Sequence, residues 1–142
     1  MIREATVKDI NAINRLLKDF KVDVDEKDFV DNPFSKYLVY EYNNEIIALV
    51  DYSSIYERSE INYIIVDPRY RKQKVATKLL EKLIERLISN NCENISLEVR
   101  DNNYSAISFY KKNGFTEVAR RKSYYGNEDG LLLVRELVKN ER

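Results

Sequence analysis

The 142-residue chain has no histidine, one cysteine and no long apolar run. Without histidine there is no Ser–His or Cys–His nucleophilic system, and a zinc site is disfavoured. Cys92 alone cannot form an internal disulfide, which fits a reducing compartment. No apolar run approaches the ~20 residues of a membrane-spanning helix, and the N-terminus lacks a signal-peptide pattern. We therefore expect a cytoplasmic protein without a membrane partner and without a bound metal.

The chain also has no excess of positive or negative charge, because 24 Lys and Arg residues balance 24 Asp and Glu residues. This balance gives no general attraction to nucleic acid, and we expect Arg120, Arg121 and Lys122 to form a solvated strand edge. Acid–base chemistry must then use carboxylates, lysines, the substrate itself or one of the 11 tyrosines. The length and the 44% hydrophobic fraction predict one folded domain over residues 1–142.

Hydrophobic periodicity predicts a mixed α/β domain in the order β-α-α-β-β-β-α-β-α-β-β. Expected strands cover residues 2–5, 37–42, 46–52, 61–66, 95–99, 116–124 and 131–137. The first expected helix has an apolar stripe from Ile10 to Phe20, and a break follows at residues 21–24. The other helices are expected from Asp25 to just before Asn32, over 75–88, and over 103–113 with Gly114 as cap. The strand–helix–strand order at 61–99 predicts a right-handed crossover with parallel pairing.

A strand, a basic turn and a helix follow one another between Ile61 and Leu80. The strand stops near Pro68, and the helix opens at Val75. Unpaired N–H groups in the first helical turn and the positive end of the helix dipole together form an anion site. The alternative is an ordinary strand–helix turn with a solvated basic face.

Three motifs resemble those of the GNAT acetyltransferases. The segment from Val66 to Ala76 follows the acyl-CoA pyrophosphate loop V-x-P-x-x-[R/Q]-x-x-G-x-[G/A], although Lys74 replaces the glycine. Residues 97–115 match L-E-V-R-x-x-N-x-x-A-I-x-x-Y-x-x-x-G-F closely. Residues 121–129 resemble the R-x-x-Y-Y…E-D tail of the RimI-like branch, the ribosomal-protein N-terminal alanine acetyltransferases. The resemblance covers roughly residues 60–137.

The resemblance implies a single-domain α/β GNAT fold that uses acetyl-CoA as co-substrate. Its sheet is mixed, mostly antiparallel and seven-stranded; the central parallel pair splays around acyl-CoA, and four helices flank it. Tyr110 matches the general acid that protonates the departing thiolate, and Glu98 matches the general base. The other readings are a core tyrosine and a solvated glutamate. A covalent route through Cys92 is disfavoured, because that residue lies in the turn between a helix and a strand.

The resemblance also assigns residues to the acetyl-CoA site. Asn103 would bind the pantetheine arm, cap the following helix, or both. Lys74 costs about 1 kcal/mol of strain if its position needs a positive φ; otherwise it points outward or adds its charge to a phosphate. The full implied set is Ile64, Ile65 and Val66 along the pantetheine, Arg71, Lys72, Gln73, Lys74, Val75, Ala76 and Thr77 at the pyrophosphate, and Asn103 and Tyr110.

The acceptor implied by the RimI-like branch is the N-terminal α-amine of a protein, for example a ribosomal protein. Tyr124 and Tyr125, together with Glu98, would shape the peptide groove; the tyrosine pair is equally compatible with plain packing. Residues 21–34 depart from the branch, which leaves a small-molecule amine or a lysine side chain open as acceptor. A CoA-binding module without catalysis is the alternative from another class. The chain is expected to act as a monomer or a dimer.

Overall fold

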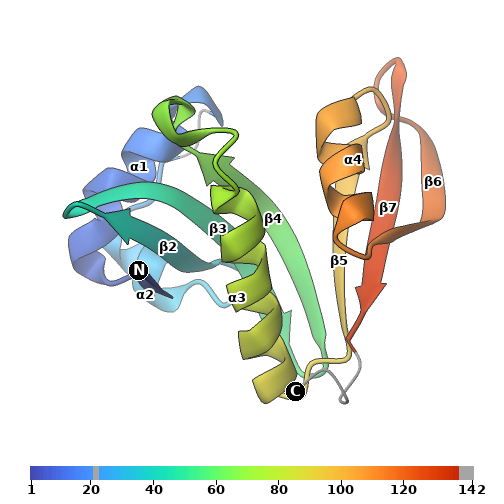
Figure 1. Ribbon diagram of the computed structural model, residues 1–142. Coiled ribbons are helices and arrows are strands. Elements are labelled where there is room, and N and C mark those ends of the chain that lie inside the picture. Colours follow the sequence, from blue (N-terminus) through green and yellow to red (C-terminus); the bar gives the residue numbers. More distant parts are fainter. Residues whose placement is uncertain (21–22, 138–142) are drawn as a thin grey trace.

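The computed structural model describes residues 1–20 and 23–137, which contain the predicted elements in the predicted order (Figure 1). The predicted break at 21–24 includes Lys21 and Val22, which lie outside the described residues. Short 3₁₀ turns η1 (Val7–Asp9), η2 (Lys18–Phe20) and η3 (Pro68–Tyr70) join the main elements. The main helices and strands, in chain order, are β1 (Ile2–Glu4), α1 (Ile10–Leu17), α2 (Glu26–Asp31), β2 (Lys36–Tyr42), β3 (Glu45–Ile55), β4 (Arg58–Val66), α3 (Val75–Ser89), β5 (Asn94–Arg100), α4 (Tyr104–Lys112), β6 (Thr116–Tyr125) and β7 (Glu128–Glu136).

The described strands form one seven-stranded sheet in the order β1-β2-β3-β4-β5-β7-β6. Every neighbouring pair is antiparallel except β4 and β5, which run parallel across the α3 crossover. The predicted mixed, mostly antiparallel sheet of a single α/β domain is therefore confirmed. Among the described residues, no helix combines the length and the apolar character needed to cross a membrane.

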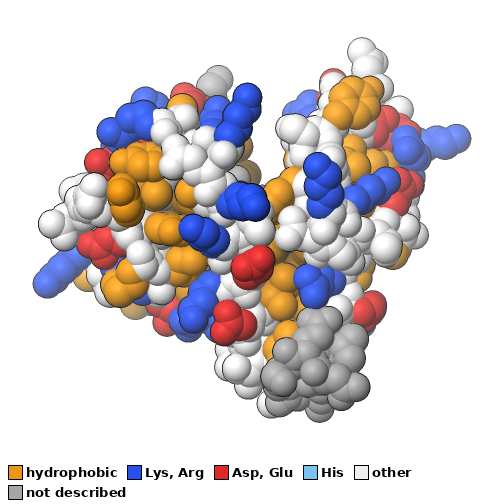
Figure 2. All heavy atoms as spheres, in the orientation of Figure 1, with side chains coloured by type: hydrophobic (Ala, Val, Ile, Leu, Met, Phe, Trp, Pro, Cys, Tyr) orange, Lys and Arg blue, Asp and Glu red, His pale blue; other side chains and the backbone are white. Residues whose placement is uncertain are grey.

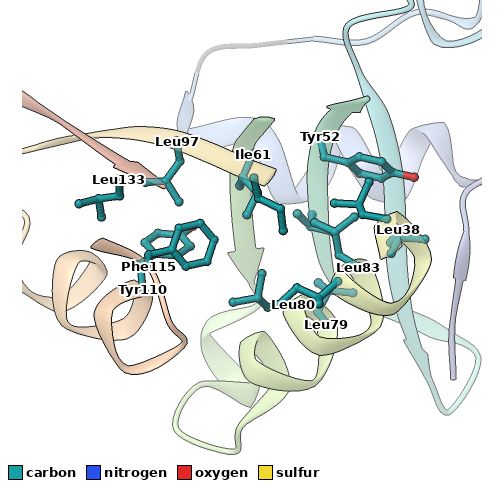
Figure 3. Packing of buried hydrophobic residues seen from close by; sticks show 14 of the residues in the cluster. Leu38, Tyr52, Ile61, Leu79, Leu80, Leu83, Leu97, Tyr110, Phe115 and Leu133 are labelled. Atoms are coloured by element: carbon teal, nitrogen blue, oxygen red, sulfur yellow. The ribbon is translucent and has the colours of Figure 1, made fainter. Parts of the chain in front are cut away.

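Two apolar clusters cover the two faces of the sheet. On one face α1 and α2 contribute to a cluster with Ile13, Leu17, Val39 and Leu49. On the other face α3 and α4 pack over the larger cluster. In Figure 3 Leu79, Leu80 and Leu83 of α3 point toward strand residues, while Tyr110 of α4 lies beside Phe115. Because β2 and β3 are covered on both sides, successive residues such as Leu38 and Val39 are both fully buried.

The parallel strands β4 and β5 separate along their length. They pair only at Arg58–Asn94, Ser59–Ile95 and Glu60–Ser96. Beyond these pairs, β4 stays paired with β3 up to Val66, with one bulge between Asp51 and Tyr52, and β5 stays paired with β7 up to Arg100. Each strand thus follows its own antiparallel partner, and a wedge opens between them (Figure 1). Figure 2 shows the molecule hollowed along the same line.

Local sequence signals explain most element ends. Asn43 and Asn44, both with positive φ, make the tight turn between β2 and β3. Gly114, at φ 91°, ends α4: its N–H donates to the Lys111 carbonyl, and the Phe115 N–H donates to the Tyr110 carbonyl at 3.0 Å. These are the bonds of a Schellman motif, so the predicted glycine cap is confirmed.

The structure corrects the prediction at the end of the first helix and at two strand starts. The α-helix ends at Leu17 and continues as a 3₁₀ turn, so Phe20 leaves the apolar stripe and is 47% exposed. Its ring contacts Tyr63 instead, with centroids 5.2 Å apart. Both β4 and β7 begin three residues earlier than predicted, because strand pairing recruits polar residues such as Arg58 and Glu128 that carry no apolar pattern.

Candidate active site

The loop between β4 and α3 is fixed at its start by Asp67, which sequence analysis missed. This buried carboxylate accepts hydrogen bonds from the Arg69 backbone N–H at 3.0 Å, from the Arg69 guanidinium, and from Arg15 at 3.2 Å. Its pKa is held well below the usual range, mainly by the hydrogen bonds from Arg69. Arg69 also pairs with Glu45. An Asp directly before proline, typical of the first position of a turn, was the available signal.

The position of Lys74 needs a left-handed backbone. Lys72 and Lys74 both have φ 63°, and Lys74 is the N-cap of α3. Of the two alternatives for Lys74, the strained one is therefore found. This conformation costs a lysine roughly 1 kcal/mol or more relative to glycine. Lys74 nevertheless lines the hollow in front of the helix, so its charge lies at the expected anion site.

The N-terminus of the 15-residue helix α3 opens into a hollow of about 270 Å³. The N–H of Lys78 donates to the Lys74 carbonyl, which leaves the earlier amides of the first turn without an intrahelical acceptor. Figure 2 shows Lys and Arg side chains bordering the opening. The lining residues include all of the predicted loop set except Gln73, namely Arg71, Lys72, Lys74, Val75, Ala76 and Thr77, together with Val66, Tyr70 and Phe109.

A second hollow of about 470 Å³ continues from the first into the wedge between β4 and α4. The two hollows share Val66, Arg71, Ala76 and Phe109. Ile64 and Ile65 line its β4 side, and Tyr110 and Asn103 line the other side. Beyond Glu60, β4 does not pair with β5. The backbone N–H and C=O groups on that edge of β4 can therefore bind an extended ligand.

Tyr110 combines a core ring with a hydroxyl that has no hydrogen-bond partner among the described residues. The residue is 8% exposed, and its ring packs against Phe109 and Phe115 with centroids 5.1 and 5.3 Å apart. Burial raises the pKa of the phenol above its usual value. The hydroxyl is therefore protonated at neutral pH and available as a proton donor. The core role is confirmed, and it leaves the hydroxyl free for chemistry.

Asn103 caps α4, because its side-chain oxygen accepts from the Ala106 N–H at 3.3 Å. The residue also lines both the wedge hollow and a third, larger hollow of about 960 Å³ on the other side. Phe20 is likewise shared by these two hollows. The three hollows thus adjoin one another and together make up a groove from the basic loop through the wedge to the far side of the sheet.

Glu98 of β5 lines the third hollow. Its neighbours Leu97 and Val99 are buried, as the alternating pattern predicts. The carboxylate oxygen Oε2 is buried and has no hydrogen-bond partner among the described residues. The other oxygen, Oε1, lies 3.5 Å from Nε of Arg121. A buried carboxylate oxygen without a donor is costly for the fold.

The walls of the third hollow are aromatic and acidic. Asp51 of β3 is buried there, accepts from Asn62 at 3.1 Å, and has a pKa raised mainly by burial. Other walls come from α2 and the segment before it, the part of the chain where the sequence departs from its resemblance. The lining residues are Phe20, Asp23, Val24, Asp28, Phe29, Asn32, Phe34, Ser35, Tyr37, Asp51, Glu60, Ile61, Asn62, Tyr63, Glu98, Val99, Arg100, Asn103 and Tyr125.

The tyrosine pair divides between two environments. Tyr125 lines the third hollow and lies beneath the Arg100 guanidinium at 4.6 Å, and burial raises its pKa. Tyr124 does not line that hollow; its ring lies beneath Arg121 at 4.8 Å and meets the Tyr125 ring edge-on. Tyr125 thus lines the third hollow together with Glu98, whereas Tyr124 does not line it.

The acidic pair at the end of the third motif takes part in ion pairs that join the β6–β7 hairpin to the end of β5 and the turn after it. Glu128 pairs with Arg100 at 2.9 Å. Asp129 accepts from Arg120 at 3.0 Å and from the Ser123 N–H at 2.8 Å, while Arg120 also reaches Asp101 at 3.4 Å. Arg120, Arg121 and Lys122 lie exposed on the edge strand β6, as predicted, and Arg120 and Arg121 also make ion pairs within the fold.

Cys92 lies in the turn between α3 and β5, as predicted, and is 5% exposed. Its sulfur contacts Ser54 Oγ at 3.3 Å, and the residue lines none of the three hollows. A thiol buried at the narrow end of the wedge is a packing group.

A splayed parallel pair, a helix N-terminus facing the wedge, and a phenol and a carboxylate along one groove define the class of acyl-CoA-dependent N-acyltransferases. Residues 8–115 match the model of the acetyltransferase (GNAT) family. The chain is 34% identical over 107 residues to the ribosomal protein bS18-alanine N-acetyltransferase of Escherichia coli strain K12. The match covers 74% of this chain and 72% of that enzyme. The chain therefore belongs to the GNAT acetyltransferases and is RimI-like within them, which makes it an N-acetyltransferase.

Solved structures agree with this assignment. The crystal structure of the ribosomal-protein-S18-alanine N-acetyltransferase from Escherichia coli matches with a TM-score of 0.84 at 25% identity, covering 96% of this chain and 93% of that one. A GNAT family acetyltransferase from Elizabethkingia anophelis with acetyl-CoA bound matches with a TM-score of 0.74 at 22% identity, covering 96% and 97%. The second likeness shows the fold alone.

Proposed function

We propose that the protein transfers the acetyl group of acetyl-CoA to the N-terminal α-amine of a protein, for example a ribosomal protein. The observation that carries the proposal is the groove: it runs from the amides at α3, past Tyr110 and Asn103, to the hollow that holds Glu98. Donor and acceptor enter from opposite sides of the sheet and meet in the wedge. Such an arrangement suits direct transfer in a ternary complex.

The donor occupies the first two hollows. Its pyrophosphate binds the loop amides from Lys72 to Thr77, where the helix dipole and the basic side chains favour negative charge. The pantetheine lies along Ile64, Ile65 and Val66 as an added strand, because that edge of β4 is not used by β5. This placement brings the thioester toward Tyr110.

In the chemical step, the amine nitrogen forms a bond to the acetyl carbonyl carbon, and the carbon–sulfur bond then breaks. Glu98, directly or through water, takes the proton that the amine loses. Tyr110 donates a proton to the departing thiolate. The demand on the base is light, because an α-amine has a pKa of about 7.7–8.0 and is partly neutral at the pH of the cytoplasm. Burial raises the pKa of the Tyr110 phenol, so the phenol holds its proton at neutral pH until the thiolate departs.

An acceptor panel tests the proposal. The protein is incubated with acetyl-CoA and three sets of amines: peptides with free N-termini, lysine peptides with blocked N-termini, and small diamines. CoA release is followed, and the products are analysed by mass spectrometry. We expect release with the first set. Release only with the second or third set would replace the acceptor, and CoA binding without release from any set would leave a non-catalytic CoA-binding module.

A further inference from the structure

The carboxylate of Glu98 lies in a gap in the sheet that glycine creates. Gly130 of β7 pairs with Arg100 of β5 on one side and with Arg121 of β6 on the other. Side chains of paired residues share a face, and Glu98 shares that face with Arg100 because it lies two residues earlier. A side chain at position 130 would therefore stand between the two arginines. Its absence leaves a space there.

The Glu98 carboxylate fills this space. A Cβ built on Gly130 would come within 2.9 Å of Glu98 Oε2, closer than real Cβ atoms approach. The same Cβ would meet the Tyr124 ring at 3.2 Å. The φ of Gly130 is outside the left-handed range, so the backbone there does not require glycine. Space for the carboxylate is the reason that the structure offers for this glycine.

Arg121 holds the carboxylate from the β6 side. Its Nε lies 3.5 Å from Glu98 Oε1, and its guanidinium lies 4.8 Å above the Tyr124 ring. The Arg121 side chain is 60% exposed, and an exposed ion pair contributes little to stability. The pair is thus poorly suited to stabilising the fold, but it fixes the direction of one carboxylate oxygen and leaves the other toward Gly130.

We infer that Arg121 and Gly130 are positioning residues for the proposed base: Arg121 orients the Glu98 carboxylate, and Gly130 provides the space in which it lies. The Tyr124 ring packs against the Arg121 guanidinium, which explains why Tyr124, unlike Tyr125, does not line the third hollow. The inference rests on the proposed function, because it assigns these residues to the reaction through Glu98.

Steady-state kinetics with the best peptide of the acceptor panel test the inference. Glu98→Gln is measured first and is expected to lower kcat by about 100-fold. Arg121→Gln and Gly130→Ala are each expected to lower kcat by about tenfold with the KM for acetyl-CoA unchanged, since a misplaced base slows chemistry without affecting donor binding. Arg121→Lys should recover part of the loss. Lys122→Gln, on the same strand, is the control and should behave as wild type.

A double-mutant cycle separates positioning from a structural role. If Arg121 acts through Glu98, Arg121→Gln should slow the Glu98→Gln enzyme by less than twofold more. Independent, multiplied losses, or wild-type kcat in both Arg121→Gln and Gly130→Ala, would overturn the inference. An inactive wild type, or a Glu98→Gln variant with normal kcat, would instead contradict the proposed function. The inference, which rests on that function, would then fail with it.

Discussion

At the scale of single residues, the groove depends on groups whose structural and chemical roles coincide. Tyr110 packs its ring in the core and keeps its hydroxyl for the wedge. Asn103 caps a helix and lines two hollows. The sequence left a core role and a catalytic role as alternatives for Tyr110, and it allowed capping, ligand binding or both for Asn103. At both positions the structural role is present without using up the polar group.

Tyr110→Phe separates the two roles. The ring and its contacts remain, so we expect the thermal midpoint to stay close to that of wild type, while kcat falls by about 100-fold because the thiolate loses its proton donor. CoA release and thermal unfolding measure the two effects. Tyr104→Phe, at an exposed position of the same helix, is the matched control. A variant that unfolds early but turns over normally would contradict this account.

Lys74 allows a comparison of strain with charge. Lys74→Gly and Lys74→Ala remove the same charge, but only glycine relieves the left-handed backbone. We expect Lys74→Gly to be about 1 kcal/mol more stable than Lys74→Ala in denaturant unfolding. Both should bind CoA more weakly than wild type by a similar factor at low salt, measured by calorimetry. Equal stability of the two variants would show that this position does not require a left-handed conformation.

At the scale of elements, the site is held by ion pairs between the ends of strands and loops. Asp67 fixes the exit of β4, and the pairs of Arg100 with Glu128 and of Arg120 with Asp101 attach the β6–β7 hairpin to the end of β5 and the turn after it. These contacts determine where the loop amides and Tyr125 lie relative to the wedge.

Asp67→Asn tests the loop anchor. The amide cannot accept all the hydrogen bonds from Arg15 and Arg69, so we expect the Kd for CoA to rise about tenfold by calorimetry. Asp25→Asn is the control, because asparagine caps α2 as well as aspartate does. Unchanged CoA affinity in Asp67→Asn would show that the loop keeps its shape without this anchor.

Asp67 also gives a pH dependence with a definite sign. Its folded-state pKa is lowered, so its contribution to stability is present above the ordinary carboxylate pKa of about 3.9 and is lost as pH falls below that value. Wild type should therefore lose more stability than Asp67→Asn between pH 5 and the acid limit of about 2 in urea unfolding. Parallel stability curves for the two proteins would contradict the lowered pKa.

At the scale of the whole molecule, periodicity and motifs predicted the element order, the parallel crossover and most of the groove. Tertiary relations were not predictable in this way. The gap at Gly130 depends on the register of β5, β7 and β6, which no local pattern encodes. The ion pair of Arg121 was not predicted, because its partner Glu98 lies on another strand, 23 positions earlier in the chain. Phe20 contacts the Tyr63 ring instead of joining the apolar stripe of the first helix, again a distant contact.

In the proposed reaction, one groove through the splayed sheet brings donor and acceptor together. A crystal structure of the protein with acetyl-CoA tests it most directly. We predict the pyrophosphate at the amides of Lys72 to Thr77, the pantetheine beside Ile64 to Val66, and the thioester sulfur next to the Tyr110 hydroxyl. Acetyl-CoA bound outside the wedge, or bound with its sulfur remote from Tyr110, would contradict the claim.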